Sequence, residues 1–232
     1  MTDALVKGYV QQQGASISAD GAYNAIRATR DGKLFTASSW KTDYVMRGMA
    51  FNVTVGGISA GGDVSLITGG GNGTTIDTDQ PELLVQTPTG HYHVPLLFSC
   101  ATQQDADADT EEGNIILFAD LTHTMLASAT ATAETPQNLL DGAGRSVSDA
   151  WSAITADVTD PTCDVLLGYA TQQVAQVTAA SCAVHRLRLD YNPEFPMFFK
   201  GPCAVVAAWG GTSAATGAAT YCWAEVPIAQ AE

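Results

Sequence analysis

Apolar and polar residues alternate with period two in short stretches along most of the chain. Eight such stretches follow residue 47, each rich in β-branched or aromatic residues and closed by Gly, Pro, Asn or Asp. Because successive side chains of a strand point to opposite faces, this pattern predicts half-buried β-strands. The predicted strands are 50–55, 82–87, 91–100, 114–121, 164–172, 184–191, 202–209 and 219–226, with weaker candidates at 5–11, 23–29 and 33–40.

Turn residues between these stretches predict how the chain reverses. Pro88-Thr89-Gly90 predicts a tight hairpin, because Pro presets φ and Gly supplies a positive φ. A long insertion, residues 122–163, separates two strands. Within it we expect short helical segments at 135–140, where Pro follows an N-capping Thr, and at 146–154 around Trp151.

Many short strands without strand-helix-strand alternation predict an all-β fold. We expect a two-sheet β-sandwich, specifically an eight-stranded jelly roll, because that fold accommodates a long insertion between strands of opposite sheets. Residues 1–47 are predicted to form an N-terminal arm with the first strands. Residues 48–232 are predicted to form a single jelly-roll-like β-sandwich, interrupted by the insertion with its short helices.

Composition narrows the possible partners. The 232 residues are 46% hydrophobic and only 15% charged, with a net charge of −14, so the chain can build a core and is not a disordered polyelectrolyte. The few Lys and Arg argue against direct nucleic-acid binding, and no apolar run is long enough for a membrane helix. The start does not read as a secretory signal. Five widely spaced Cys without a C-x-x-C pair favour reduced thiols and synthesis in a cytoplasm over a disulfide framework.

The charge is unevenly distributed along the chain. Residues 1–47 carry a net charge of +2, residues 48–144 contain twelve acids and no Lys or Arg, and residues 145–232 carry −4. One interpretation is an arm that docks on the acidic middle of a neighbouring copy through Lys7, Arg27 and Arg30. The other is an ordinary asymmetry between solvated surfaces.

Two groups of residues are candidate metal ligands. Asp105, Asp107, Asp109 and Glu111 place carboxylates at alternate positions of a loop, a spacing that can bind Ca²⁺, although the loop lacks the turn Gly and the bidentate Glu of an EF-hand. The alternative is a solvated loop. His91 and His93 lie on one face of a predicted strand and would bind Zn²⁺ only with a third ligand; half-exposed surface residues are the alternative.

No pattern of residues predicts catalysis. The chain has no G-x-S-x-G, and its Gly-rich stretches lack the Lys-Ser/Thr of a phosphate loop. We therefore expect a protein that is not an enzyme and that has no cofactor beyond the calcium considered above. The loop 193–202 is aromatic instead, and we expect Phe195, Phe198 and Phe199 to form a contact between subunits.

The C-terminal third carries a resemblance. The segment FPMFFKGPCAVVAAWGGTSAATGAATYCWAEVP, residues 195–227, resembles the closing strand pair of small virion structural proteins of bacteriophages, with a Pro-flanked loop, a Thr/Ala/Gly-rich turn and a last strand ending in Trp-x-Glu. The opening segments, residues 4–18 and 29–40, are similar in style. The insertion 122–163 and the five Cys depart from that pattern.

The resemblance implies a capsid, coat or capsid-decorating protein that is built on a jelly roll and present in many copies. Such a protein is made in the host cytoplasm and located in the virion, and its partners are copies of itself and other virion proteins. A surface with few charges fits this expectation, because neutral surfaces cost less to desolvate than charged ones. The competing expectation is a receptor- or carbohydrate-binding β-sandwich with aromatic residues on its loops.

Overall fold

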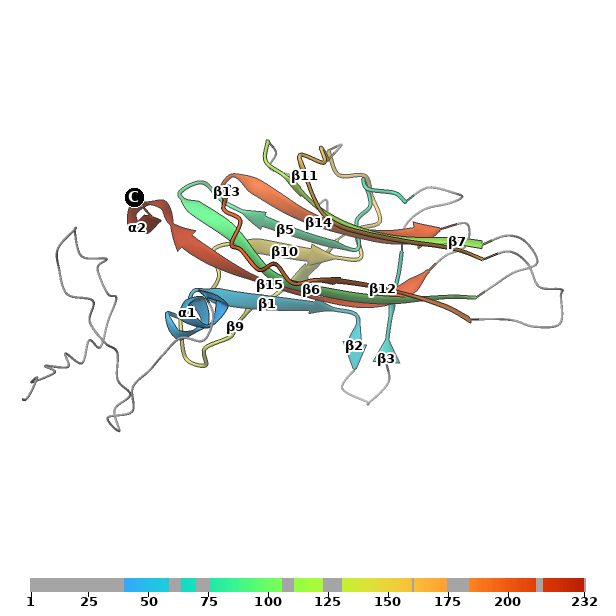
Figure 1. The fold of residues 1–232 in the computed structure, drawn as a ribbon, viewed down its shortest axis with the longest axis horizontal. Coiled ribbons are helices and arrows are strands. Elements are labelled where there is room, and N and C mark those ends of the chain that lie inside the picture. Colours follow the sequence, from blue (N-terminus) through green and yellow to red (C-terminus); the bar gives the residue numbers. More distant parts are fainter. Residues whose placement is uncertain are drawn as a thin grey trace, which may run out of the picture.

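Two antiparallel β-sheets packed face to face form the body of the protein (Figure 1). The computed structural model describes residues 40–58, 64–69, 76–105, 111–122, 131–159, 161–174, 184–211 and 215–231. It confirms the predicted all-β, two-sheet sandwich. The weak strand candidates 5–11 and 23–29 lie outside the described residues; of the third, only Trp40 is described, and it begins a helix rather than ending a strand.

The first sheet, sheet I, has seven strands. Its main order is β12-β6-β15-β1-β9, with β13 paired to β6 and β4 paired to β15. Their bounds are β1 (Ala50–Val55), β4 (Ile67–Thr68), β6 (His91–Asp105), β9 (Gln137–Asn138), β12 (Val184–Tyr191), β13 (Phe199–Lys200) and β15 (Thr216–Pro227).

The second sheet, sheet II, has six strands in the order β11-β7-β14-β5-β10-β8. Their bounds are β5 (Leu83–Thr87), β7 (Glu111–Asp120), β8 (Thr132–Glu134), β10 (Asp149–Ser152), β11 (Val165–Val174) and β14 (Cys203–Gly211). A separate ribbon, β2 (Gly57–Ile58) with β3 (Val64–Ser65), projects from the sandwich in Figure 1. The helices are α1 (Trp40–Met46) and α2 (Ile228–Ala231), and neither is long and apolar enough to cross a membrane.

All eight strands predicted from alternation after residue 47 are present. β1 and β12 have the predicted bounds, whereas β6 and β15 are longer than predicted. In chain order the eight are β1, β5, β6, β7, β11, β12, β14 and β15. The first pairs with the eighth, the second with the seventh, the third with the sixth and the fourth with the fifth.

Two local predictions were wrong. The turn at 88–90 is present, with Gly90 at φ +89°, but β5 and β6 belong to different sheets, so the turn crosses the sandwich and is not a hairpin. The insertion 122–163 contributes strands β8, β9 and β10 where short helices were expected. Trp151 pairs with Leu84 of β5, and Asn138 pairs with Phe51 of β1, so pairing with a sheet edge overrides the local helix signal.

The core lies between the two sheets and is dominated by large aromatic residues. Trp209 of β14 and Tyr221 and Trp223 of β15 are fully buried, together with Phe98 of β6. Each large aromatic side chain buries more apolar area than an aliphatic one, so these residues contribute strongly to the stability of the sandwich. Close packing also fixes the backbone at Gly201, where a Cβ atom would lie 2.1 Å from a backbone carbonyl oxygen.

The outer faces of both sheets are partly covered. On sheet I, α1 packs beside a small apolar cluster that includes Ala50, Val94 and Val226. On sheet II, the segment after β10 places Ile154 and Val158 over Leu84 and other outer residues. Helix α1 and the segment after β10 leave other parts of the outer surface exposed. The candidate subunit-contact surface lies among those exposed parts.

Candidate subunit-contact surface

The loop between β12 and β13 is attached to α1. The indole Nε1 of Trp40 donates a hydrogen bond to the backbone carbonyl of Glu194 at 2.9 Å, and Lys41 Nζ donates to Asn192 Oδ1. Lys41 also lies over the Trp40 ring, 5.2 Å from its centroid, and burial lowers the pKa of its ammonium group. The helix therefore fixes the start of an otherwise irregular loop.

This loop exposes two of the three predicted aromatic residues. Phe195 is 77% exposed and Phe198 is 46% exposed. Phe198 packs edge-to-face on Tyr92 of β6, with ring centroids 6.0 Å apart. We call Tyr92, Phe195 and Phe198 the aromatic surface. Large side chains exposed together in this way are typical of interaction sites.

Phe199 differs from its neighbours. It is the first residue of β13, pairs with His93 of β6, and is only 5% exposed because its side chain joins the core. In this conformation Phe199 cannot form a subunit contact, which corrects that prediction. Alternation explains the difference, since adjacent residues of an extended segment point in opposite directions.

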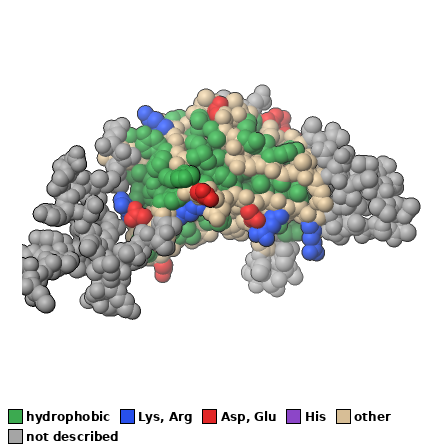
Figure 2. Space-filling view, in the orientation of Figure 1, with side chains coloured by type: hydrophobic (Ala, Val, Ile, Leu, Met, Phe, Trp, Pro, Cys, Tyr) green, Lys and Arg blue, Asp and Glu red, His purple; other side chains and the backbone are tan. Residues whose placement is uncertain are grey.

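Charged side chains are few on the face drawn in Figure 2, which has broad hydrophobic areas. Beside the aromatic residues in the chain, Glu194 and Lys200 are exposed. Two ion pairs of the described residues are Arg188 with Asp190 at 2.6 Å and Arg47 with Asp43 at 2.7 Å. Pairing lowers the cost of removing such groups from water.

The histidine pair does not form a metal site. His93 is fully buried, and both of its ring nitrogens are engaged, Nδ1 with Thr87 Oγ1 at 2.8 Å and Nε2 with the hydroxyl of Tyr221. Its ring stacks on Trp223, and desolvation lowers the pKa of His93 to about 3. Among the described residues, no group of three or more His, Cys, Asp and Glu is placed to hold a metal ion.

A buried carboxylate lies at this same end of the sandwich. Glu225 of β15 is 5% exposed and accepts hydrogen bonds from Ser146 Oγ, the backbone N–H groups of Val147 and Ser148, and Trp223 Nε1. Thr87 Oγ1 hydrogen-bonds Ser148 Oγ at 2.8 Å and so links this carboxylate cluster to the histidine. The network has a structural use: it holds the insertion against β15.

Several candidate residues fall outside the described part of the chain. Lys7, Arg27 and Arg30 of the predicted arm lie there, as do Asp107 and Asp109 of the calcium candidate. The backbones of Asp105 and Glu111 end β6 and begin β7. The arm contact and the calcium site both remain predictions.

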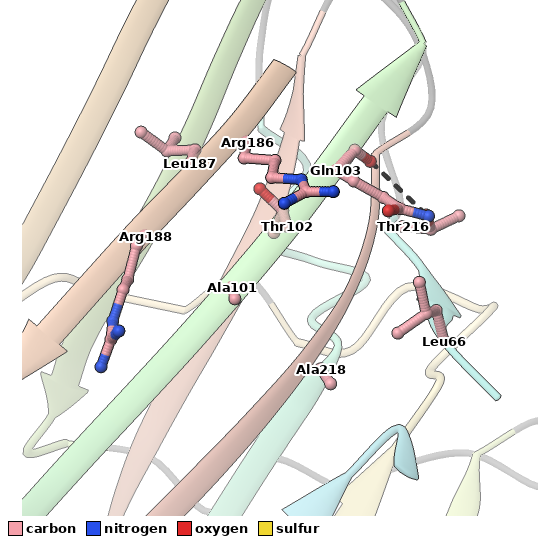
Figure 3. Close-up of a pocket in the computed structure, with 9 residues that line it drawn as sticks. All are labelled: Leu66, Ala101, Thr102, Gln103, Arg186, Leu187, Arg188, Thr216 and Ala218. Atoms are coloured by element: carbon pink, nitrogen blue, oxygen red, sulfur yellow. Dashed lines mark hydrogen bonds between the residues drawn. The ribbon is translucent and has the colours of Figure 1, made fainter. Parts of the chain in front are cut away.

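A shallow hollow lies on sheet I near β4 (Figure 3), with a volume of about 350 Å³. It combines apolar groups such as Leu66 with the polar side chains of Gln103, Arg186 and Thr216. Thr216 Oγ1 donates a long hydrogen bond, 3.4 Å, to the backbone carbonyl of Gln103. Sequence reasoning missed this hollow, because it depends on β4 and β12 lying beside the same part of sheet I.

Comparison of the chain with protein-family models, with curated proteins and with solved structures gives no match.

Proposed function

We propose that this protein is a virion structural protein that assembles in many copies as a capsid, coat or capsid-decorating subunit, with a structural rather than a catalytic role. The observation that carries the proposal is the aromatic surface, in which Phe195 is 77% exposed on a loop tethered to α1. Exposing such rings to water is unfavourable unless a partner covers them.

The strand pairing supports a jelly roll as the fold of this subunit. A jelly roll is a long antiparallel ribbon wound into two sheets, so its eight strands pair first with eighth, second with seventh, third with sixth and fourth with fifth. The eight long strands of this chain have those pairings. The remaining strands, β8, β9 and β10, then extend the sheets at their edges.

The low charge density supports assembly in many copies. Only 15% of residues are charged, and the resemblance of residues 195–227 to closing strands of bacteriophage virion proteins agrees with this role. Such a protein would be made in the host cytoplasm and located in the virion. Its partners would be its own copies and other virion proteins, without direct contact to nucleic acid or membrane.

Electron microscopy of the purified full chain tests the proposal. Rings, shells or regular arrays of subunits are expected, and a variant that lacks residues 1–20 tests the predicted arm in the same images. Fewer assemblies without the arm would support arm docking, whereas full yield would exclude it. A field of separate monomers for the full chain, with and without other virion components, would contradict the proposal.

A receptor- or carbohydrate-binding module is the second candidate. The hollow in Figure 3 favours it, because guanidinium, amide and hydroxyl groups lie beside apolar side chains there, as in many sugar sites. Binding to a glycan array tests this candidate. A monomer whose glycan binding is lost in Arg186→Ala would favour the module over the virion subunit.

A further inference from the structure

A second exposed apolar surface lies on the outer face of sheet II. Leu166 and Tyr169 of β11 are 57% and 51% exposed, and Leu121, which follows β7, is 39% exposed. Strand pairing places Leu166 opposite Phe118 of β7. The end of β7 is also bound to the start of β11, because the backbone N–H of Leu121 donates a hydrogen bond to Asp164 Oδ2 at 2.7 Å. We call Leu121, Leu166 and Tyr169 the β11 surface.

A β-bulge creates this surface. The register between β11 and β7 shifts between Leu166 and Gly168, so Leu166 and Tyr169 both lie on the outer face. Val165, Leu167 and Ala170 pack against the core instead. Without the bulge, strict alternation would place Leu166 and Tyr169 on opposite faces. The chain therefore departs from regular pairing at the place where it exposes two large side chains.

The two sheets differ in charge. The six strands of sheet II contain five acids and no Lys or Arg. The strands of sheet I contain Arg186, Arg188 and Lys200 together with Asp105, Asp190 and Glu225, so their formal charges cancel. Beside the surfaces themselves, Asp164 is exposed two residues before Leu166, and Lys200 is exposed two residues after Phe198.

We infer that copies of this chain associate head to tail, an inference that rests on the proposed function. In this contact, the aromatic surface and Lys200 of one copy bind the β11 surface and Asp164 of the next. The opposite charges of exposed Lys200 beside one surface and exposed Asp164 beside the other favour a second copy of this chain as the occupant. Since the two surfaces belong to different sheets, the contact is heterologous, and repeating it generates rings or extended assemblies.

Two variants that each remove one half of the contact test this inference. Phe195→Ser removes the most exposed ring of the aromatic surface, and Leu166→Ser removes the most exposed residue of the β11 surface. Each is expected to weaken self-association by at least about tenfold in sedimentation equilibrium. Leu139→Ser, at a residue 40% exposed outside both surfaces, is the matched control and is expected to associate like the native chain. Circular dichroism verifies that all three fold.

Mixing the two variants distinguishes head-to-tail association from other contacts. Each variant retains the half that the other lacks, so an equimolar mixture is expected to form dimers of twice 24.2 kDa and nothing larger. Lys200→Glu and Asp164→Lys should each weaken association about two- to fivefold, and combining them in one chain should restore it.

The outcomes separate this inference from the proposed function. A monomeric native chain contradicts the proposed function itself. A native chain that assembles while Phe195→Ser or Leu166→Ser assembles equally well overturns the head-to-tail contact only. A mixture of the two variants that stays monomeric overturns it as well, because the intact aromatic surface of one variant then does not bind the intact β11 surface of the other.

Discussion

Replacing Glu225 with Ala tests whether a buried carboxylate holds the insertion in place. Four donors would lose this acceptor. Ser146 Oγ and the N–H of Ser148 keep others, because Ser146 Oγ also donates to the Ser148 carbonyl and the Ser148 N–H also donates to Ser146 Oγ. Val147 is exposed, so its N–H can bind water, whereas Trp223 is buried. A hydrogen bond to a charged group contributes about 1.5–3 kcal/mol, so losing the bond from Trp223 Nε1 predicts a decrease of roughly 1.5–3 kcal/mol in the free energy of unfolding.

Urea unfolding followed by tryptophan fluorescence measures this change, provided that the m-value is unchanged. Glu225→Gln should lower the free energy of unfolding less, because its side-chain carbonyl oxygen can still accept hydrogen bonds. Its NH2 group cannot, since it faces N–H donors. Glu194→Ala, at an exposed acid, is the control and should be nearly neutral. A Glu225→Ala variant within about 1 kcal/mol of the native chain would refute the reasoning.

Three further predictions concern pH, packing and thiol reactivity. Since burial lowers the pKa of His93 from 6.5 to about 3, the unfolded chain binds the proton at higher pH than the folded chain, and the free energy of unfolding should fall as pH drops from 6.5 toward 3. This fall should exceed that of His93→Gln by up to about 1.4 kcal/mol per pH unit. An equal loss of stability between pH 7 and pH 5 in the native chain and in His93→Gln would contradict this. Gly201→Ala should cost about 2 kcal/mol or more in thermal unfolding, because its Cβ would lie 2.1 Å from a carbonyl oxygen, whereas Gly57→Ala, with open space around it, should be tolerated. Iodoacetamide should alkylate exposed Cys163 well before Cys203, where burial raises the thiol pKa to about 12; peptide mapping that finds equal rates would exclude this.

Alternation predicted the long strands because each has one face toward the core. β1 alternates between buried and less buried positions from Phe51 to Val55, and β12 does so from Arg186 to Tyr191, so their bounds could be read from the sequence. β9 and β10 could not, because they are short and exist only through pairing with strands distant in the chain. The crossing at Gly90 was missed for a related reason: a Pro-x-Gly turn has the same sequence whether its strands pair or not.

The candidate site was predicted in part. Phe195 and Phe198 were identified from their place in a Pro-flanked loop, and their exposure is consistent with that prediction. The β11 surface could not be identified, because VLLGY reads as an alternating strand and only the bulge before Gly168 places Leu166 and Tyr169 on one face. Gly in a strand interior is the one signal that could have indicated the bulge.

The central claim is that this chain associates with copies of itself. Light scattering of the full chain coupled to size exclusion, over a series of micromolar concentrations, measures its native mass directly. The account predicts a species that contains several copies of the 24.2 kDa chain and dissociates on dilution or on Phe195→Ser substitution. A mass of 24.2 kDa throughout the series would contradict it.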